Sequence, residues 1–289
     1  MVRVLVLGAS GMLGSQVFSH LRNCGFDVLG STRSGELSGN PQSMIKLDIE
    51  NFSESIFTAT EPPLWVINCI GIVKARIRSA RDKAIATRVN SYFPHQLNAA
   101  AEKFGFRVIQ IATDCVYSGT VGQYTEDSPH DPTDIYGMSK SLGEVESERF
   151  LNLRCSIIGP EPHGDSSLVE WVRSQPFGSE INGFVNHLWN GVTTLAFAKL
   201  VAGIIRTDSF EAGTFHVTPR DIVTKDQLVR LIALRLERQD LVVNPVAAPS
   251  LVERSLMTSF PDLNSRLWGD AGYEKIPSIR ELVEECPIR

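Results

Sequence analysis

Short apolar runs alternate with amphipathic stretches along the first half of the chain. The apolar runs have the length of strands and lie at residues 2–7, 27–31, 44–48, 64–69, 106–111 and 151–157. After the first run, apolar residues recur at helical spacing: Met12, Leu13, Val17, Phe18 and Leu21. Strands that alternate with helices form parallel sheets with helices on both faces. The pattern therefore predicts an α/β fold, a Rossmann-type doubly wound parallel sheet.

The pattern loosens after the segment from Gly159 to Gly164, which contains two prolines. Beyond it we expect a helix at 194–205, a short strand at 213–217 and a helix at 225–238. The chain contains no run of about 20 apolar residues, so we expect no membrane span. It begins without a signal-peptide pattern, and its five cysteines are scattered without C-x-x-C spacing. We therefore expect a reduced, cytoplasmic protein.

The charge distribution changes this picture in one place. A net charge of −5 argues against a nucleic-acid partner. Basic side chains nevertheless crowd the segment 74–88, with Asp82 as its single acid: Lys74, Arg76, Arg78, Arg81, Lys83 and Arg88. This segment either forms a solvated helix face or attracts a phosphate-rich ligand, such as the cofactor or a nucleotide sugar. The six histidines show no metal-ligand spacing.

A glycine-rich segment directly follows the first predicted strand. Glycine allows close approach of a pyrophosphate, and the N-terminus of the following helix offers free N–H groups and partial positive charge. The strand, turn and helix therefore predict a dinucleotide cradle, although the same glycines would suit a tight turn with close helix packing. The residues expected to form the cradle are Gly8, Ser10, Gly11, Met12, Leu13 and Gly14.

The end of the second predicted strand bears on the choice of cofactor. NAD enzymes commonly place an acid there for the ribose 2′-hydroxyl, but this chain has Arg33 and no acid before Glu36. Because a guanidinium can pair with a 2′-phosphate, we expect NADPH or NADP rather than NADH. Arg33 could instead be a solvated loop charge. Asp48, followed by Ile49, is expected either to accept from the adenine amino group or to cap a helix.

A second motif suits proton transfer. Tyr136 and Lys140 lie four residues apart and would share one helix face. A nearby ammonium favours the phenolate and lowers the tyrosine pKa, which ordinarily lies near ~10. Lys140 can also hold the nicotinamide ribose, so Tyr136 and Lys140 are expected to contact the cofactor as well. Thr113 ends a predicted strand and could hydrogen-bond a substrate oxygen. With the glycine cradle, these residues predict hydride transfer between a nicotinamide cofactor and a carbonyl or alcohol.

These motifs resemble an extended short-chain dehydrogenase/reductase, and most closely the dTDP-4-dehydrorhamnose reductase family. The resemblance covers nearly the whole chain. Its motifs are the glycine segment, Asn68-Cys69-Ile70-Gly71, Val89-Asn90, Thr113 to Gly119, Tyr124 to Asp127, Tyr136 to Lys140 and Leu153-Arg154. It implies a catalytic triad of Thr113, Tyr136 and Lys140, with Asn90 helping to place the lysine through water. It also implies cofactor contacts at Cys69, Ile70 and Gly71.

The resemblance further implies a smaller, interleaved substrate-binding domain. We accordingly expect a dinucleotide-binding domain at 1–159 and a mainly substrate-binding domain at 160–289, with some segments returning to the core. Candidate sugar or nucleotide contacts are Asp114, Arg154, His187 and Asn190.

The chain departs from the family at three positions. Members often carry a Trp shortly after the Leu-Arg pair, where this chain reads Cys155 to Ile158. Some members bind Mg²⁺ through an acid at the position of Gln16, so we expect no metal here. Related dehydratases place a Glu where Cys115 stands, and a thiol cannot serve as that acid, so dehydration is disfavoured.

These observations together predict an NADPH-dependent reductase of a keto-sugar nucleotide, with Tyr136 as general acid and a homodimer as a possible assembly. A sugar-nucleotide epimerase that retains its NAD is the alternative enzyme. The third candidate is a non-catalytic, NADP-binding regulatory subunit of a methionine adenosyltransferase, which shares the resemblance.

Overall fold

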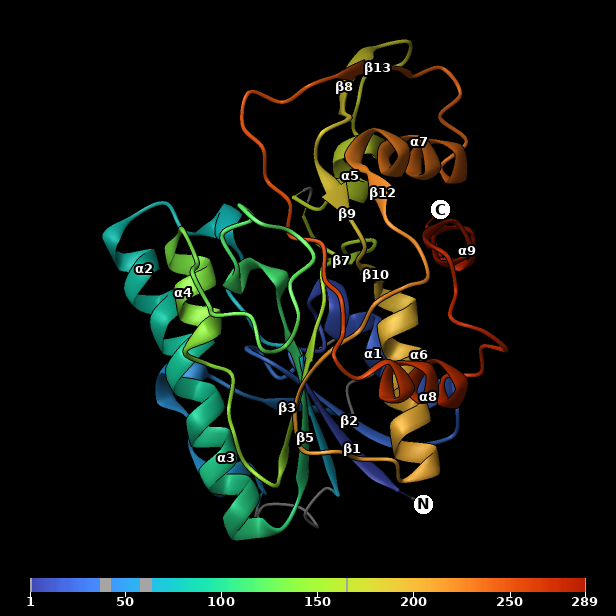
Figure 1. The fold of residues 1–289 in the computed structure, drawn as a ribbon. Helices are drawn as coiled ribbons and strands as arrows, with labels where there is room; N and C mark the ends of the chain where they lie inside the picture. The colour runs from blue at the N-terminus through green and yellow to red at the C-terminus, as the bar shows by residue number, and fades with distance from the viewer. Residues whose placement is uncertain (1, 37–42, 58–63, 165, 289) are drawn as a thin grey trace.

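A single parallel sheet organises the protein, as the computed structural model shows (Figure 1). The structure describes residues 2–36, 43–57, 64–164 and 166–288. In spatial order the sheet is β11-β6-β5-β4-β1-β2-β3, and every neighbouring pair is parallel. Its strands are β1 (Arg3–Leu7), β2 (Asp27–Thr32), β3 (Met44–Lys46), β4 (Trp65–Asn68), β5 (Arg107–Ala112), β6 (Phe150–Arg154) and β11 (Gly213–His216). The predicted Rossmann-type sheet is confirmed.

Helices cover both faces of this sheet (Figure 1). One face carries α1 (Met12–Asn23), α6 (Thr194–Thr207) and α8 (Pro261–Asp270), whose apolar side chains share a core with those of β1 and β4. The other face carries α3 (Phe93–Phe104), with α2 (Ala80–Thr87) and α4 (Ile135–Ser141) on the same side. The order of strands reverses on either side of β1, and ligands of such sheets bind at the carboxyl ends there.

A second apolar cluster lies outside the sheet layers. It is built from α5 (Leu168–Arg173), α7 (Lys225–Arg235) and α9 (Ile279–Glu285), with parts of three short strand pairs. These pairs are β8 (Glu180–Phe184) with β13 (Val242–Val246), β9 (Leu188–Trp189) with β12 (Val223–Thr224), and β7 (Ile157–Ile158) with β10 (Val192–Thr193). By contrast, α6, β11 and α8 belong to the sheet layers although they follow residue 159. The domain division at 159 stays a prediction.

Several predicted boundaries were wrong. The strand expected at 151–157 ends at Arg154, because the chain then leaves the sheet and Ser156 accepts a hydrogen bond from the Val192 amide. The helix expected at 225–238 ends at Arg235, and Glu237 adopts a positive φ of 57° that no α-helix continues. Among the described helices, none has both the length and the apolar character needed to cross a membrane.

Candidate active site

The glycine segment forms a tight connection between β1 and α1. A Cβ atom on Gly14 would lie 2.1 Å from the carbonyl oxygen of Gly8, so the helix approaches the turn as only glycine allows. The Gly8 amide donates to the Ser31 hydroxyl at 3.1 Å, which ties the turn to β2. The N-cap residue, Gly11, has no side chain to satisfy the first helical N–H groups. These donors are available to an anion.

A cavity of about 560 Å³ adjoins this turn. Its walls include the predicted cofactor residues Gly8, Ser10, Gly11, Met12, Arg33, Asp48, Ile49, Cys69, Ile70 and Gly71. Arg33 is exposed at its rim. Asp48 lines the cavity and also caps a short 3-10 helix, accepting from the Glu50 amide at 3.1 Å and from the Asn51 side chain at 2.8 Å. Both expectations for Asp48 are therefore compatible with its position.

A second cavity, of about 360 Å³, continues from the first. The two share Gly11, Met12, Cys69, Ile70, Gly71, Arg76 and Glu161 as lining residues. The residues that line the second cavity include Leu13, Thr113, Asp114, Tyr136 and Lys140. The structure thus brings the predicted proton-transfer residues to the same cleft as the glycine segment.

Helix α4 carries both Tyr136 and Lys140. Asp134 caps it, accepting from the Gly137 amide at 2.9 Å. Lys140 is 7% exposed and its Nζ donates to the carbonyl oxygen of Ile111, at the end of β5, at 2.8 Å. Burial lowers the pKa of Lys140 to about 8, while the Glu144 carboxylate opposes this shift.

The pKa of Tyr136 departs from the sequence-based expectation. Burial, with the Cys115 thiol as a smaller cause, raises the pKa of Tyr136 above its ordinary value, and the Thr113 hydroxyl opposes the shift. Lys140, expected to lower this pKa, is not among the main causes of the shift, and burial dominates because taking a phenolate out of water is costly. Tyr136 therefore keeps its proton at neutral pH, as a proton donor must.

Asn90 lies in a π-helical turn at Arg88–Tyr92 and is buried. Its side chain accepts from the Ile72 amide at 2.8 Å and donates to the Ser139 hydroxyl at 3.0 Å. Asn90 thus connects the wall of the cofactor cavity to the residue before Lys140. Its action on Lys140 through water stays a prediction.

The four expected substrate contacts lie in different settings. Asp114 lines the second cavity, and burial raises the pKa of its carboxyl group. Arg154 is 2% exposed and is held by protein groups rather than directed into either cavity. His187 faces the carbonyl oxygen of Ser250 at 2.8 Å. Asn190 donates to the carbonyl oxygen of Leu256 at 2.7 Å and accepts from its amide at 3.0 Å.

The basic segment divides between the cleft and the surface. Arg76 lines both cavities and Arg81 lines the larger one, whereas Lys74 forms an ion pair with Asp134 at 2.8 Å. Across the cleft, Glu161 also lines both cavities. The sequence signalled Arg76 and Arg81 only as part of a charge cluster. Glu161 carried no signal because it lies in an irregular loop.

Two cysteines that line the cleft, Cys69 and Cys115, have unreactive thiols. Burial raises the pKa of Cys69 to about 12, and burial with the Asp114 carboxylate raises that of Cys115 to about 12. Because the thiolate is the reactive form, Cys115 acts as a small packed side chain. Over the described ranges, no three His, Cys, Asp or Glu side chains gather as a metal site would require.

Comparison with known proteins identifies the family of this chain. The model of the family described as RmlD substrate binding domain matches residues 2–287. The chain belongs to this family. It is 32% identical to the dTDP-4-dehydrorhamnose reductase of Streptomyces griseus, over 98% of this chain and 92% of that protein. It is 30% identical to methionine adenosyltransferase 2 subunit beta of Danio rerio, over 80% of this chain and 73% of that protein.

A solved dTDP-4-dehydrorhamnose reductase shares the fold. The dTDP-4-dehydrorhamnose reductase of Bacillus anthracis, crystallised in complex with NADP, superposes with a TM-score of 0.77 at 21% identity, covering 98% of each chain. The resemblance to extended short-chain dehydrogenase/reductases, seen in the sequence motifs, is thereby confirmed. The relatives named dTDP-4-dehydrorhamnose reductase are NAD(P)-dependent oxidoreductases.

Proposed function

We propose that this protein is an NADPH-dependent reductase that acts on a keto-sugar attached to a nucleotide. The observation that carries the proposal is the continuous cleft, with the glycine turn at one end and Thr113, Tyr136 and Lys140 at the other. The residues of the larger cavity fit a dinucleotide: uncapped helical N–H groups for a pyrophosphate, and Arg33 for a 2′-phosphate. The relatives named dTDP-4-keto-6-deoxy-D-glucose reductase and dTDP-4-dehydrorhamnose reductase support the same class of enzyme.

A bound nicotinamide would supply the hydride that reduces the carbonyl carbon. Tyr136 gives its hydroxyl proton to the carbonyl oxygen, which becomes the alcohol. Its raised pKa keeps this proton in place until the oxygen gains negative charge. Thr113 directly follows β5, its hydroxyl contacts that of the tyrosine, and it donates a second hydrogen bond to the same substrate oxygen. Lys140, charged below a pH of about 8, favours the phenolate that forms as the proton leaves.

The test is NADPH oxidation, followed by absorbance, with a panel of 4-keto-sugar nucleotides. We expect turnover with at least one of them. An epimerase would instead interconvert sugars without net consumption of NADPH. The regulatory alternative, favoured by the zebrafish relative, would bind NADPH and a partner protein without turnover. The free cysteines support a cytoplasmic location, and a homodimer remains a further proposal.

Replacing Arg33 by Ala is expected to weaken NADPH binding by roughly 10- to 100-fold, because a charge-assisted contact contributes about 1.5–3 kcal/mol. NADH binding should change little, since NADH has no 2′-phosphate. Titration of both cofactors measures the difference. Arg88→Ala is the control, because this arginine lies outside the two cavities. Equal affinity of the unmutated protein for both cofactors would contradict the assignment.

Chelation of divalent metals should leave turnover unchanged. Gln16 offers no carboxylate, and no described cluster has the composition of a metal site. The measurement is the rate of NADPH oxidation before and after EDTA. Activity that disappears with EDTA and returns with Mg²⁺ would show that a metal is required.

A further inference from the structure

The side chain of Arg154 uses all five of its N–H donors inside the protein. Nε and Nη2 bind the two oxygens of Glu144 at 3.0 and 2.6 Å. Nη1 donates to the Tyr117 hydroxyl at 2.6 Å and to Nε2 of His216 at 2.7 Å. The second N–H of Nη2 points to Nε2 of His130 at 3.0 Å. A guanidinium has five donors, so this set is complete.

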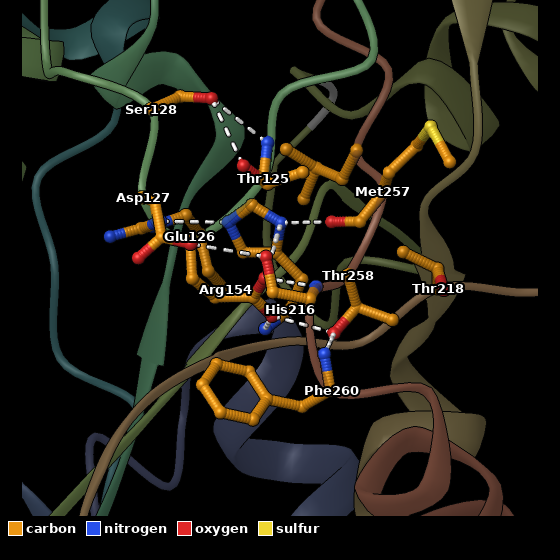
Figure 2. A network of polar contacts seen from close by, with 12 residues as sticks. Thr125, Glu126, Asp127, Ser128, Arg154, His216, Thr218, Met257, Thr258 and Phe260 are labelled. Carbon is orange, nitrogen blue, oxygen red and sulfur yellow. Dashed lines mark hydrogen bonds and ion pairs between the residues drawn. The ribbon is translucent and has the colours of Figure 1, made fainter.

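Both histidines are neutral in this arrangement, because each offers a lone pair to the guanidinium. The other nitrogen of His216 faces the carbonyl oxygen of Met257, and Figure 2 shows the ring between this carbonyl and Arg154. Burial, with the Arg154 charge, lowers the pKa of His216 to about 4. Arg154 therefore stays fully bonded throughout the neutral pH range.

Two partners of Arg154, Tyr117 and Glu144, belong to the segments that carry the proton-transfer residues, whereas His216 lies in β11. Tyr117 closes the short turn that begins at Thr113. Glu144 follows Lys140 by four residues, and His130 also contacts Ser141, the last residue of α4, at 2.7 Å. One buried guanidinium thus fixes the turn of Thr113 against the helix of Tyr136 and Lys140.

Glu144 lies one turn of chain beyond Lys140, because the Gly143 amide donates to the Lys140 carbonyl oxygen at 3.1 Å and the Glu144 amide donates to that of Ser141 at 3.3 Å. At this separation its charge acts on the Lys140 ammonium. The groups that face the ammonium are Glu144 on the same segment, the thiols of Cys69 and Cys155 from the neighbouring strands, and the carbonyl of Ile111. Of these, the Glu144 carboxylate opposes most strongly the loss of the lysine proton on burial. The Glu144 side chain is 8% exposed and forms an ion pair with Arg154 at 2.6 Å.

We propose that Glu144 and Arg154 are positioning residues: Arg154 holds the Thr113 turn and helix α4 in register, and Glu144 keeps Lys140 charged within the cleft. The role in turnover rests on the proposed reductase function. The effect on Lys140 does not, since it concerns the titration of one side chain. This gives Arg154 a task other than the substrate contact expected from the sequence.

The deciding variant is Glu144→Gln, which keeps one acceptor for Arg154 and removes the negative charge. The pH dependence of Lys140 acylation by an amine reagent, read by mass spectrometry, reports the lysine titration without requiring turnover. We expect its midpoint to fall by about one pH unit. The alkaline limb of NADPH-dependent turnover should move by the same amount.

Glu126→Gln is the matched control. Glu126 belongs to the same network (Figure 2), where it binds the Thr258 hydroxyl at 2.7 Å and the Ser259 amide at 2.8 Å. It is not among the groups whose charge acts on Lys140. This variant should lower the melting temperature and leave the Lys140 midpoint unchanged. An unchanged midpoint in Glu144→Gln as well would overturn the proposal. If the unmutated protein reduced no keto-sugar while the midpoint still shifted, the proposed function alone would fail.

If Glu144→Gln does not fold, the Arg154→Lys variant tests the proposal instead. It keeps both charges but cannot make five bonds. We expect kcat to fall at least about 10-fold, because small displacements of positioned groups are costly, with NADPH affinity retained. A lower melting temperature with unchanged kcat would show a merely structural pair and overturn the proposal.

Discussion

Replacing Tyr136 by Phe is expected to lower turnover by roughly 10²–10⁴-fold, the scale for losing a positioned general acid. The change removes one hydroxyl from a ring on the second cavity and leaves the glycine turn and Lys140 untouched. NADPH binding and the melting temperature should therefore remain close to those of the unmutated protein. Single-turnover reduction of a keto-sugar, beside a cofactor titration, measures both quantities.

Tyr92→Phe is the matched control, because its ring is 60% exposed and lies outside both cavities. It should keep full activity. Near-full activity of Tyr136→Phe would remove the tyrosine from the reaction. Lys140→Met should differ from Tyr136→Phe in one respect, since it should also weaken cofactor binding if the lysine holds the nicotinamide ribose.

Gly137→Ala is expected to lower turnover by roughly 10²-fold and to destabilise the fold. A Cβ atom at this position would lie 2.1 Å from the carbonyl oxygen of Cys115 and 2.8 Å from Cβ of Pro132. The backbone of the Thr113 turn would have to move away from α4, and displacements near 1 Å cost about 10²-fold in rate. Overpacking of this kind costs about 1–3 kcal/mol of stability. Kinetics and thermal unfolding measure the two effects.

Gly269→Ala gives the comparison. Gly269 also lies in a helix, α8, but an added Cβ would meet nothing within 4 Å. Alanine there should raise stability by up to about 1 kcal/mol, because it has the higher helix propensity. If both variants behaved alike, the close contact at Gly137 would have no part in the geometry of the site.

The sheet could be predicted from the sequence because its strands are nearly continuous apolar runs, as buried parallel strands are. The cleft residues at the ends of the strands were predictable for a related reason, since each follows directly after such a run, whereas Tyr136 and Lys140 were predictable from their spacing on one helix. Arg154 is the last residue of β6, and its sequence context does not distinguish a ligand contact from a buried ion pair. The partners of Arg154 lie at four separate points of the chain, so no local sequence pattern predicts them: Tyr117, His130, Glu144 and His216.

The position of β11 at the edge of the sheet affects how the molecule can be made. Its partner β6 already pairs with β5 but gains its second neighbour only when residues 213–216 have been synthesised, and α1 gains its covering helix only with residues 194–207. Until then a nascent chain exposes an unpaired strand edge and the apolar side chains Val17, Phe18 and Leu21. About three quarters of the chain must therefore be synthesised before the sheet and its covering helices can be completed. A fragment that ends at residue 159 is expected to aggregate.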